Sequence, residues 1–171
     1  GAFAGPGDEV IFVRYGFAVY EIAARRVGAT PVIAPDRDYA TDIDAVLACI
    51  TDRTRLIFIA NPNNPTGRLI EPARLLDWHD ELAERGGWLV VDEAFIDCTP
   101  QHSLAAYSDM PGLIVLRSFG KFFCLAGLRL GFVLAGLECV HQVGKQCKNR
   151  EPLPANPAVC AKKAWLQWAD C

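Results

Sequence analysis

The clearest strand of the chain runs directly into its most unusual loop, in the residues Leu56-Ile-Phe-Ile-Ala-Asn-Pro-Asn-Asn-Pro-Thr-Gly67. The strand part is apolar without alternation, which is typical of a strand buried on both faces of a sheet. The loop part holds two Asn-Pro steps and a glycine, a composition that reverses the chain. A buried strand that ends in a polar loop predicts a sheet whose strand ends carry functional groups.

Strand-like and helix-like segments alternate along the rest of the chain. We expect further strands at residues 10–13, 30–34, 88–91, 113–116 and 132–135, and helices at residues 17–27, 43–50 and 71–84. Continuous apolar strands that alternate with helices favour a parallel sheet covered on both faces. The sequence therefore predicts an α/β fold with three αβα layers and a mostly parallel sheet.

Composition and charge exclude several classes of protein. The chain has 171 residues, 51% of them hydrophobic and 22% charged, which is the balance of an ordinary globular domain. Its net charge of −3 provides no basic face for a nucleic acid. The most apolar region, residues 113–133, is interrupted by Arg117, Lys121 and Arg129, so no membrane helix is expected.

The cysteines indicate a reducing compartment. There are seven, an odd number, and none of them forms a C-x-x-C pair. That pattern favours reduced thiols in a cytoplasmic protein over a disulfide framework. The three histidines are not spaced with a cysteine as metal ligands are, so no metal site is expected.

The ends of the chain suggest a piece of a longer protein. The first residue is Gly1 rather than methionine, and no signal peptide is visible. We expect residues 1–135 to form part of a cofactor-binding large domain. Residues 136–171 are expected to form a connection, with a possible helix at 158–169, towards a truncated small domain.

Lys121 lies on a turn of small residues, three positions after Ser118 and eight before Arg129. A neutral amine can condense with an aldehyde, while a hydroxyl and a guanidinium group can hold a phosphate. This pattern predicts a site for an aldehyde cofactor that carries a phosphate, although a lysine on a loop can also be a plain surface residue.

Two more polar residues follow predicted strands. Asp92 comes directly after the strand at 88–91, and Asn64 lies in the loop after the strand at 56–60. An acid after a strand can simply cap a turn, and asparagine often only reverses the chain. Because the carboxyl ends of parallel strands meet at one edge of a sheet, we expect both residues to lie near Lys121.

With these motifs the chain resembles the large domain of fold-type I pyridoxal-phosphate enzymes, the class I/II aminotransferases. Residues 7–135 carry the resemblance, which is closest to histidinol-phosphate aminotransferases of histidine biosynthesis and threonine-phosphate decarboxylases of cobalamin biosynthesis. It implies pyridoxal 5'-phosphate as the cofactor and a cytoplasmic homodimer. The substrates that it implies are a phosphorylated amine or amino acid and a 2-oxo acid.

The resemblance also implies a role for each residue of the site. Lys121 would form a Schiff base with the cofactor and then move the proton at the substrate α-carbon. Asp92 would keep the ring nitrogen protonated, and Asn64 would bind the phenolic oxygen of the ring. Ser118 and Arg129 would bind the phosphate.

Other residues near these motifs are expected to have minor roles in the site. The resemblance places the ring of Tyr15 against the cofactor ring, whereas Tyr20 is expected to pack within its helix. Asn61 and Asn63 are expected to shape the loop. Gly120 stands where many relatives carry a second hydroxyl group, so one phosphate contact is missing.

Phe95 departs from the pattern of relatives that transaminate, because they usually carry a tyrosine after Asp-Glu-Ala and phenylalanine has no donor. The motifs around Asp92 and Lys121 resemble the decarboxylases, whereas residues 15–20 and 61–67 resemble the aminotransferases. The change falls near residues 68–74, which fits either a natural intermediate or a chain joined there.

The sequence therefore predicts a pyridoxal-phosphate-dependent aminotransferase of histidinol-phosphate type, which transfers an amino group to a 2-oxo acid through a Schiff base on Lys121. A threonine-phosphate decarboxylase, or an inactive fragment of either enzyme, is the alternative.

Overall fold

The computed structural model of the protein describes residues 1–128 and 130–139. Its larger sheet contains the strands β1 (Glu9–Val13), β2 (Thr30–Ala34), β5 (Thr54–Ala60), β6 (Trp88–Asp92), β7 (Leu113–Ser118) and β8 (Gly131–Ala135). A small hairpin is formed by β3 (Asp36–Arg37) and β4 (Ala40–Thr41). The helices are α1 (Val19–Arg26), α2 (Ile43–Ala48) and α3 (Pro72–Ala83), with short 3-10 helices at Ile96–Cys98, Pro100–His102, Ala105–Tyr107 and Ala126–Leu128.

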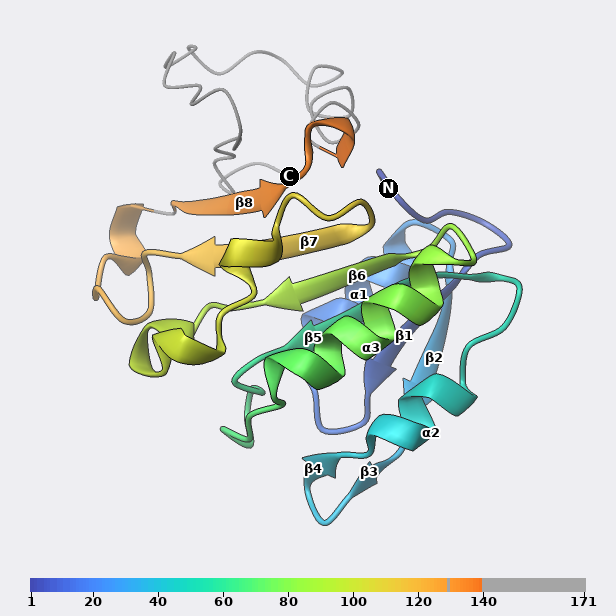
Figure 1. Ribbon diagram of the computed structural model, residues 1–171, viewed down its shortest axis with the longest axis horizontal. Coiled ribbons are helices and arrows are strands. Elements are labelled where there is room, and N and C mark those ends of the chain that lie inside the picture. Colours follow the sequence, from blue (N-terminus) through green and yellow to red (C-terminus); the bar gives the residue numbers. More distant parts are fainter. Residues whose placement is uncertain (129, 140–171) are drawn as a thin grey trace.

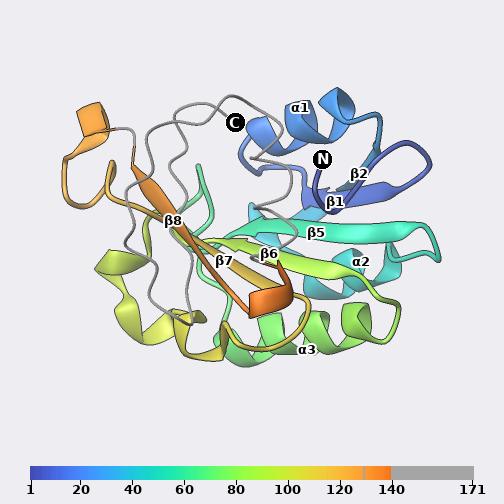
Figure 2. The ribbon, with the colours of Figure 1, turned by 90° about the horizontal axis from the view of Figure 1, so that it is seen from above.

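The six-stranded sheet has the order β2-β1-β5-β6-β7-β8. Every neighbouring pair from β2 to β7 is parallel, and β8 pairs antiparallel with β7 at the edge. Helix α1 covers one face, and α2 and α3 cover the other (Figures 1 and 2). The predicted three-layer α/β fold with a mostly parallel sheet is thereby confirmed.

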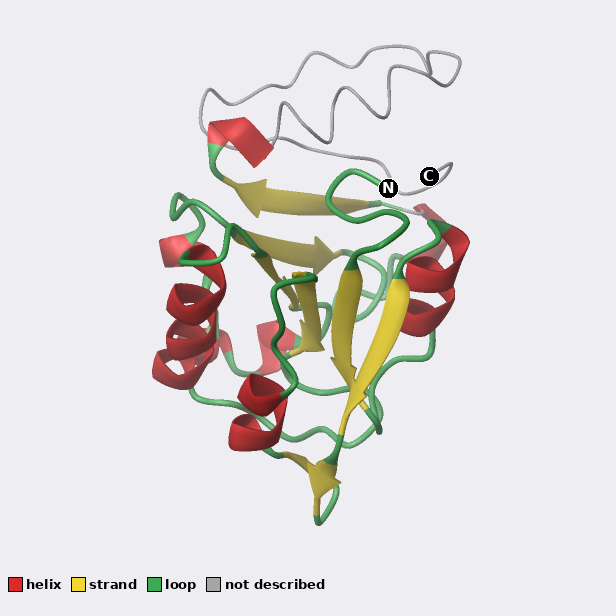
Figure 3. Ribbon diagram, turned by 90° about the vertical axis from the view of Figure 1, so that its right-hand side faces the viewer, coloured by secondary structure: helices red, strands yellow, loops and turns green. Residues whose placement is uncertain are grey.

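Two apolar clusters hold the layers together, one on each face of the sheet. Figure 3 shows the helices on both sides of the strands. Under α3, the fully buried side chains of Leu75, Trp78 and Leu82 contact the sheet at helical spacing. Under α1, Tyr20 and Ala24 do the same on the opposite face. The central strands are thus buried on both sides, which explains their continuous apolar sequence.

Most predicted elements match the observed ones within one or two residues. The helix predicted at 71–84 is α3, with Glu71 and Glu84 at its ends. Asp42 begins α2 because its side chain accepts a hydrogen bond of 3.1 Å from the Ala45 backbone N–H. The helix predicted at 158–169 lies outside the described residues. No helix in the described ranges is long and apolar enough to cross a membrane.

The β3–β4 hairpin was not predicted. Its turn passes through Asp38 and Tyr39 at φ values of 51° and 60°. Glycine or asparagine usually marks such a turn in a sequence, and neither residue is present here.

Candidate active site

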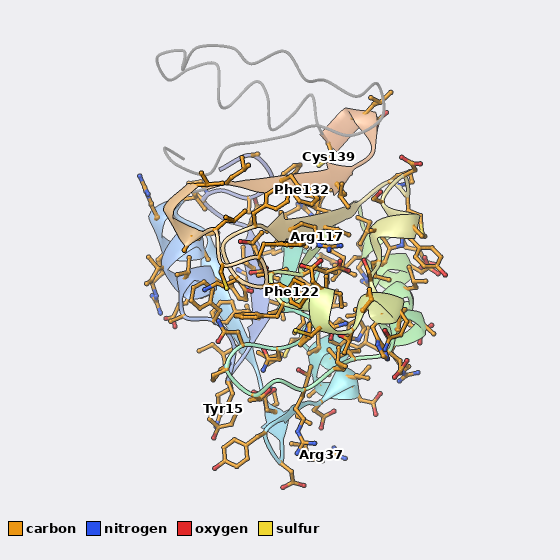
Figure 4. The ribbon with its side chains drawn as sticks, turned by 90° about the vertical axis from the view of Figure 1, so that its left-hand side faces the viewer. Tyr15, Arg37, Arg117, Phe122, Phe132 and Cys139 are labelled. Carbon is orange, nitrogen blue, oxygen red and sulfur yellow. The ribbon has the colours of Figure 1, made fainter. Side chains whose placement is uncertain are left out.

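Three neighbouring strands end at the same edge of the sheet. Asp92, the last residue of β6, pairs with Ala60 at the end of β5 and with Leu116 near the end of β7. The Asn-Pro loop therefore begins beside Asp92 on one side, and Ser118 lies two residues beyond Leu116 on the other. Figure 4 views the molecule from this end of β6 and β7. The predicted convergence of strand ends is present.

Asp92 is partly buried and both of its carboxylate oxygens have donors. The Tyr20 hydroxyl donates to Oδ2 at 2.9 Å, and the Ala94 backbone N–H donates to Oδ1 at 3.0 Å. Burial raises the pKa of Asp92, while the hydrogen bonds from Tyr20 and Ala94 and the charge of Lys121 lower it. Burial thus disfavours the charged carboxylate, and the two hydrogen bonds and the charge of Lys121 offset part of this effect.

Lys121 lies in the loop between β7 and β8. Its Nζ atom is 5.4 Å from the centroid of the Phe95 ring, in the range of a cation–π contact. Its charge is also close enough to lower the pKa of Asp92. The amine therefore lies over the loop that follows Asp92, as expected for a pair that acts on one cofactor.

The loop that carries Lys121 is tightly closed. The Ser118 Oγ atom accepts a hydrogen bond of 3.1 Å from the Gly120 backbone N–H, and the Leu125 N–H donates to the Phe119 carbonyl at 3.2 Å. A Cβ atom at Gly120 would lie 3.4 Å from the Cα atom of Ala126 and 3.5 Å from Ser118 Oγ, which are ordinary van der Waals distances. Arg129, the predicted phosphate ligand, lies outside the described residues.

The asparagines of the loop after β5 make different hydrogen bonds. The buried side chain of Asn61 donates to the Ile70 carbonyl and accepts from the Ile70 N–H, at 3.0 and 2.8 Å. The Asn63 amide donates to the Tyr15 carbonyl at 3.0 Å, which ties this loop to the end of β1. Both residues shape the loop, as predicted. Asn64 is partly buried in the same loop.

The aromatic residues that follow β1 have different neighbours in the structure. The Tyr15 ring packs on Tyr39 of the hairpin turn, with ring centroids 4.9 Å apart. The Tyr15 backbone N–H also donates to Asp36 Oδ2 at 2.7 Å, and Figure 4 labels Tyr15. The ring that reaches Asp92 is that of Tyr20, so its predicted role as a helix-packing residue is incomplete.

Phe17 is a second aromatic residue that the sequence reasoning left out of the site. Its ring meets Tyr20 edge-on, with centroids 5.7 Å apart and an angle of 88° between the planes. Since 41% of Phe17 is exposed, it has a free surface next to the Tyr20–Asp92 pair. The sequence carried one usable signal, because Phe17 and Tyr20 are three residues apart at the start of a helix.

A separate hollow lies at the other end of the strands. It is lined by residues that include Trp88 and Leu113, which begin β6 and β7, together with Met110 and Leu137. None of the predicted site residues lines it. The hollow is therefore distinct from the group of polar residues around Asp92.

The residues around Asp92 fit a phosphorylated aldehyde with a ring nitrogen. An acid that already has two donors can accept one more hydrogen bond from a protonated ring. An amine, an amide and a hydroxyl group lie at or after the strand ends at the same edge of the sheet, on Lys121, Asn64 and Ser118. This set of groups suits the aldehyde, the ring oxygen and the phosphate of pyridoxal 5'-phosphate.

Comparison with known proteins supports the same conclusion. Residues 1–150 match the family Aminotransferase class I and II. Histidinol-phosphate aminotransferase of Sphingopyxis alaskensis is 47% identical over 144 residues, which are 82% of this chain and 38% of the relative. Threonine-phosphate decarboxylase of Pseudomonas aeruginosa is 62% identical over 95 residues, which are 56% of this chain and 29% of the relative.

Solved structures show the same fold. Histidinol-phosphate aminotransferase from Clostridium acetobutylicum superposes with a TM-score of 0.74 at 27% identity, over 85% of this chain and 44% of that structure. Aromatic aminotransferase from Pyrococcus horikoshii gives 0.75 at 29% identity, over 86% and 42%. The chain thus spans less than half the length of these relatives.

The family assignment made from the motifs is confirmed by the match over residues 1–150. It implies pyridoxal 5'-phosphate as the cofactor. The chain belongs to the class I and II aminotransferases.

Proposed function

We propose that this chain is the cofactor-binding part of a pyridoxal-phosphate-dependent aminotransferase of histidinol-phosphate type. The observation that carries the proposal is the place of Lys121 in the loop after β7, where its amine lies 5.4 Å from the Phe95 ring, three residues after Asp92, and where its charge acts on the Asp92 carboxyl group. When bound, the cofactor supplies an aldehyde that reacts with amines and a ring that accepts electrons from the substrate.

Lys121 and Asp92 have complementary tasks. The Lys121 amine would hold the cofactor and would take and return the proton at the substrate α-carbon. The Asp92 carboxylate would accept a hydrogen bond from the ring nitrogen and keep it protonated. Both tasks require the two side chains to face the same ligand, which is why their proximity supports the proposal.

The remaining residues orient the ligand. Asn64 is proposed to donate to the phenolic oxygen of the ring, and Ser118 and Arg129 to bind the phosphate. Tyr15 is proposed to stack on the ring. Phe17, which lies beside the Tyr20–Asp92 pair, is a second candidate for that contact.

The proposed substrates are a phosphorylated amine or amino acid and a 2-oxo acid. Two of the similar relatives are named for phosphorylated compounds, histidinol phosphate and threonine phosphate. Transfer of the amino group to a 2-oxo acid would complete the reaction that the term aminotransferase describes.

Decarboxylation is the second candidate, and two observations favour it. The threonine-phosphate decarboxylase shares 62% identity with part of this chain, a higher value than the aminotransferase over its longer match. Phe95 also lacks the hydroxyl group that aminotransferases usually carry at this position. Release of carbon dioxide from phosphothreonine without formation of a 2-oxo acid would decide for the decarboxylase.

We also propose a homodimer in the cytoplasm. Four apolar residues of the Lys121 loop are exposed, which suits a contact between two copies: Phe122, Phe123, Leu125 and Leu128. The cysteines at positions 49, 98, 124 and 139 are free thiols, in keeping with a reducing compartment.

Borohydride reduction tests the proposal directly. After incubation with pyridoxal 5'-phosphate, reduction should fix one pyridoxyl group on Lys121, which peptide mass mapping locates. Lys121→Ala should abolish the labelling, whereas Lys145→Ala should leave it unchanged. A folded chain that stays unlabelled, or one labelled equally in Lys121→Ala, would contradict the proposal and favour an inactive fragment.

A further inference from the structure

We propose that Tyr20 positions Asp92 and keeps its carboxyl group ionised beneath the cofactor ring, an inference that rests on the proposed function. The two residues are 72 positions apart in sequence, yet the Tyr20 hydroxyl donates to Asp92 Oδ2 at 2.9 Å. Helix α1 supplies the tyrosine and β6 supplies the acid, so the contact joins one outer layer to the middle of the sheet.

The Tyr20 ring is held in place by two other aromatic rings. It stacks on Phe58 of β5, with centroids 4.1 Å apart and an angle of 22° between the planes, and meets Phe17 edge-on. Only 4% of the residue is exposed. A ring fixed in this way aims its hydroxyl group at one place, and this place is the Asp92 carboxylate.

The hydroxyl group acts only as a donor at this position. Burial and the negative charge of Asp92 raise the pKa of Tyr20, so the phenol keeps its proton over the whole range in which proteins are folded. An ionised carboxylate has no proton to donate, and the hydrogen bond therefore runs from Tyr20 to Asp92. Such a bond favours the charged form of the acid.

Three groups offset the burial of Asp92, and each comes from a different part of the fold. They are the Tyr20 hydroxyl from α1, the Ala94 backbone N–H after β6, and the Lys121 charge from the loop after β7. Lys121 must be neutral in order to react with an aldehyde, and a neutral Lys121 no longer lowers the pKa of Asp92. In that state Tyr20 is the side chain that still lowers the pKa of Asp92.

The arrangement also leaves room for the ligand. A carboxylate offers about four lone-pair positions, and Tyr20 and Ala94 use one on each oxygen. The free positions can accept a hydrogen bond from the protonated ring nitrogen while the carboxylate stays in one orientation. Tyr20 thus acts through Asp92 and has no need to touch the cofactor.

Tyr20→Phe is the variant that tests this role in the full chain, because it keeps the stacked ring and removes only the hydroxyl group. In the protein without cofactor, carbon-13 NMR of labelled aspartate should show the pKa of Asp92 about one unit higher than in the wild type. The dissociation constant of pyridoxal 5'-phosphate, measured by fluorescence, should rise about 10-fold. Tyr107→Phe, which removes an exposed hydroxyl group elsewhere, should change neither value.

A double-mutant cycle separates this role from a structural one. If Tyr20 acts through Asp92, then Tyr20→Phe should weaken cofactor binding much less in the Asp92→Asn background. Fluorotyrosine at position 20 provides a second probe that preserves the shape of the ring, and its more acidic hydroxyl should lower the pKa of Asp92. Circular dichroism checks that each variant is folded.

The outcomes for Tyr20 and for the proposed function can be told apart. An unchanged pKa of Asp92 in Tyr20→Phe, or an equal loss of cofactor affinity with and without Asp92, would overturn the inference. A wild-type chain that binds no pyridoxal 5'-phosphate would contradict the proposed function instead, and the titration without cofactor would still decide for Tyr20.

Discussion

Asp92 shows at the scale of one residue how a functional group can conflict with stability. Its carboxyl group is partly buried, and burial raises its pKa above the ordinary value even though three groups act in the other direction. The unfolded chain would hydrate this charge fully. The ionised Asp92 therefore lowers the stability of the fold, and its proposed function is to bind a protonated ring.

Asp92→Asn should consequently stabilise the chain without cofactor at neutral pH, by about 1 kcal/mol, and should weaken cofactor binding. The gain depends on pH in a defined direction. Because folding raises the pKa of Asp92, the contribution of this group to the free energy of unfolding of the wild type is largest below its unfolded-state pKa. This stabilisation is lost as the pH rises through the folded-state pKa. The advantage of the variant should thus be small at acid pH and largest at neutral pH.

Urea unfolding of the wild type and Asp92→Asn at several pH values measures this difference. Asp44→Asn, on the outer part of α2, serves as the control. An advantage of Asp92→Asn that shrinks as the pH rises would have the wrong sign and would contradict the stated cost of burial.

At the scale of elements, a buried ionic group ties the segment after β6 to β7. Glu93 is fully buried and accepts hydrogen bonds from the Ser103 hydroxyl at 2.7 Å and the Leu104 N–H at 2.6 Å. Arg117 of β7 lies 3.5 Å from Glu93 and also pairs with Asp97. Since Glu93 follows Asp92 and Arg117 precedes Ser118, this group fixes the two strand ends that form the site.

Arg117→Met should be strongly destabilising, because it leaves Glu93 buried without its cation. The expected loss is about 3 kcal/mol, or a fall in Tm of roughly 6–12 °C for a chain of this size. Adding Glu93→Gln should recover part of the loss, since it removes the unpaired charge. Arg74→Met breaks an exposed pair with Asp77 and should cost under about 0.5 kcal/mol.

Thermal unfolding followed by circular dichroism measures each step of this cycle. If the losses of stability from Arg117→Met and Glu93→Gln were additive in the double variant, the two residues would not be coupled, which would contradict the observed geometry.

The same elements show what could be predicted from the sequence. Strands β2 and β6 and helix α3 were found within a residue because apolar runs, helical spacing and the Gly86-Gly87 stop are local signals. The contacts Tyr20–Asp92 and Arg117–Glu93 were not found. They join residues 72 and 24 positions apart, and only the order of strands and helices brings such residues together.

The site was predicted in the same uneven way. The positions of Asp92 and Lys121 near the carboxyl ends of β6 and β7 could be predicted, because each lies at or shortly after an apolar strand. The aromatic position was harder, because Tyr15, Phe17 and Tyr20 all follow β1 within seven residues of its end. Which ring reaches Asp92 depends on where α1 starts, and this was predicted two residues too early.

At the scale of the whole molecule, the loop that carries Lys121 is exposed in the described part of the chain. The loop between β7 and β8 carries Lys121, and four of its apolar side chains are between 43% and 57% exposed: Phe122, Phe123, Leu125 and Leu128. An apolar surface of this kind on a soluble domain usually marks a contact with another protein surface. A second copy placed there would also shield Lys121 from water.

We therefore expect the full chain to sediment as a dimer, and Phe122→Ser combined with Leu128→Ser to raise its dissociation constant about 100-fold. Ile22→Ser is a matched control, because Ile22 is 62% exposed but lies on α1 at the outer face of the sheet. If the double variant bound pyridoxal 5'-phosphate as tightly as the wild type while monomeric, the partner copy would be shown to add nothing to the cofactor site. A wild-type chain that stays monomeric at high concentration would contradict the dimer itself, and the exposed residues at 122–128 would then need another covering surface.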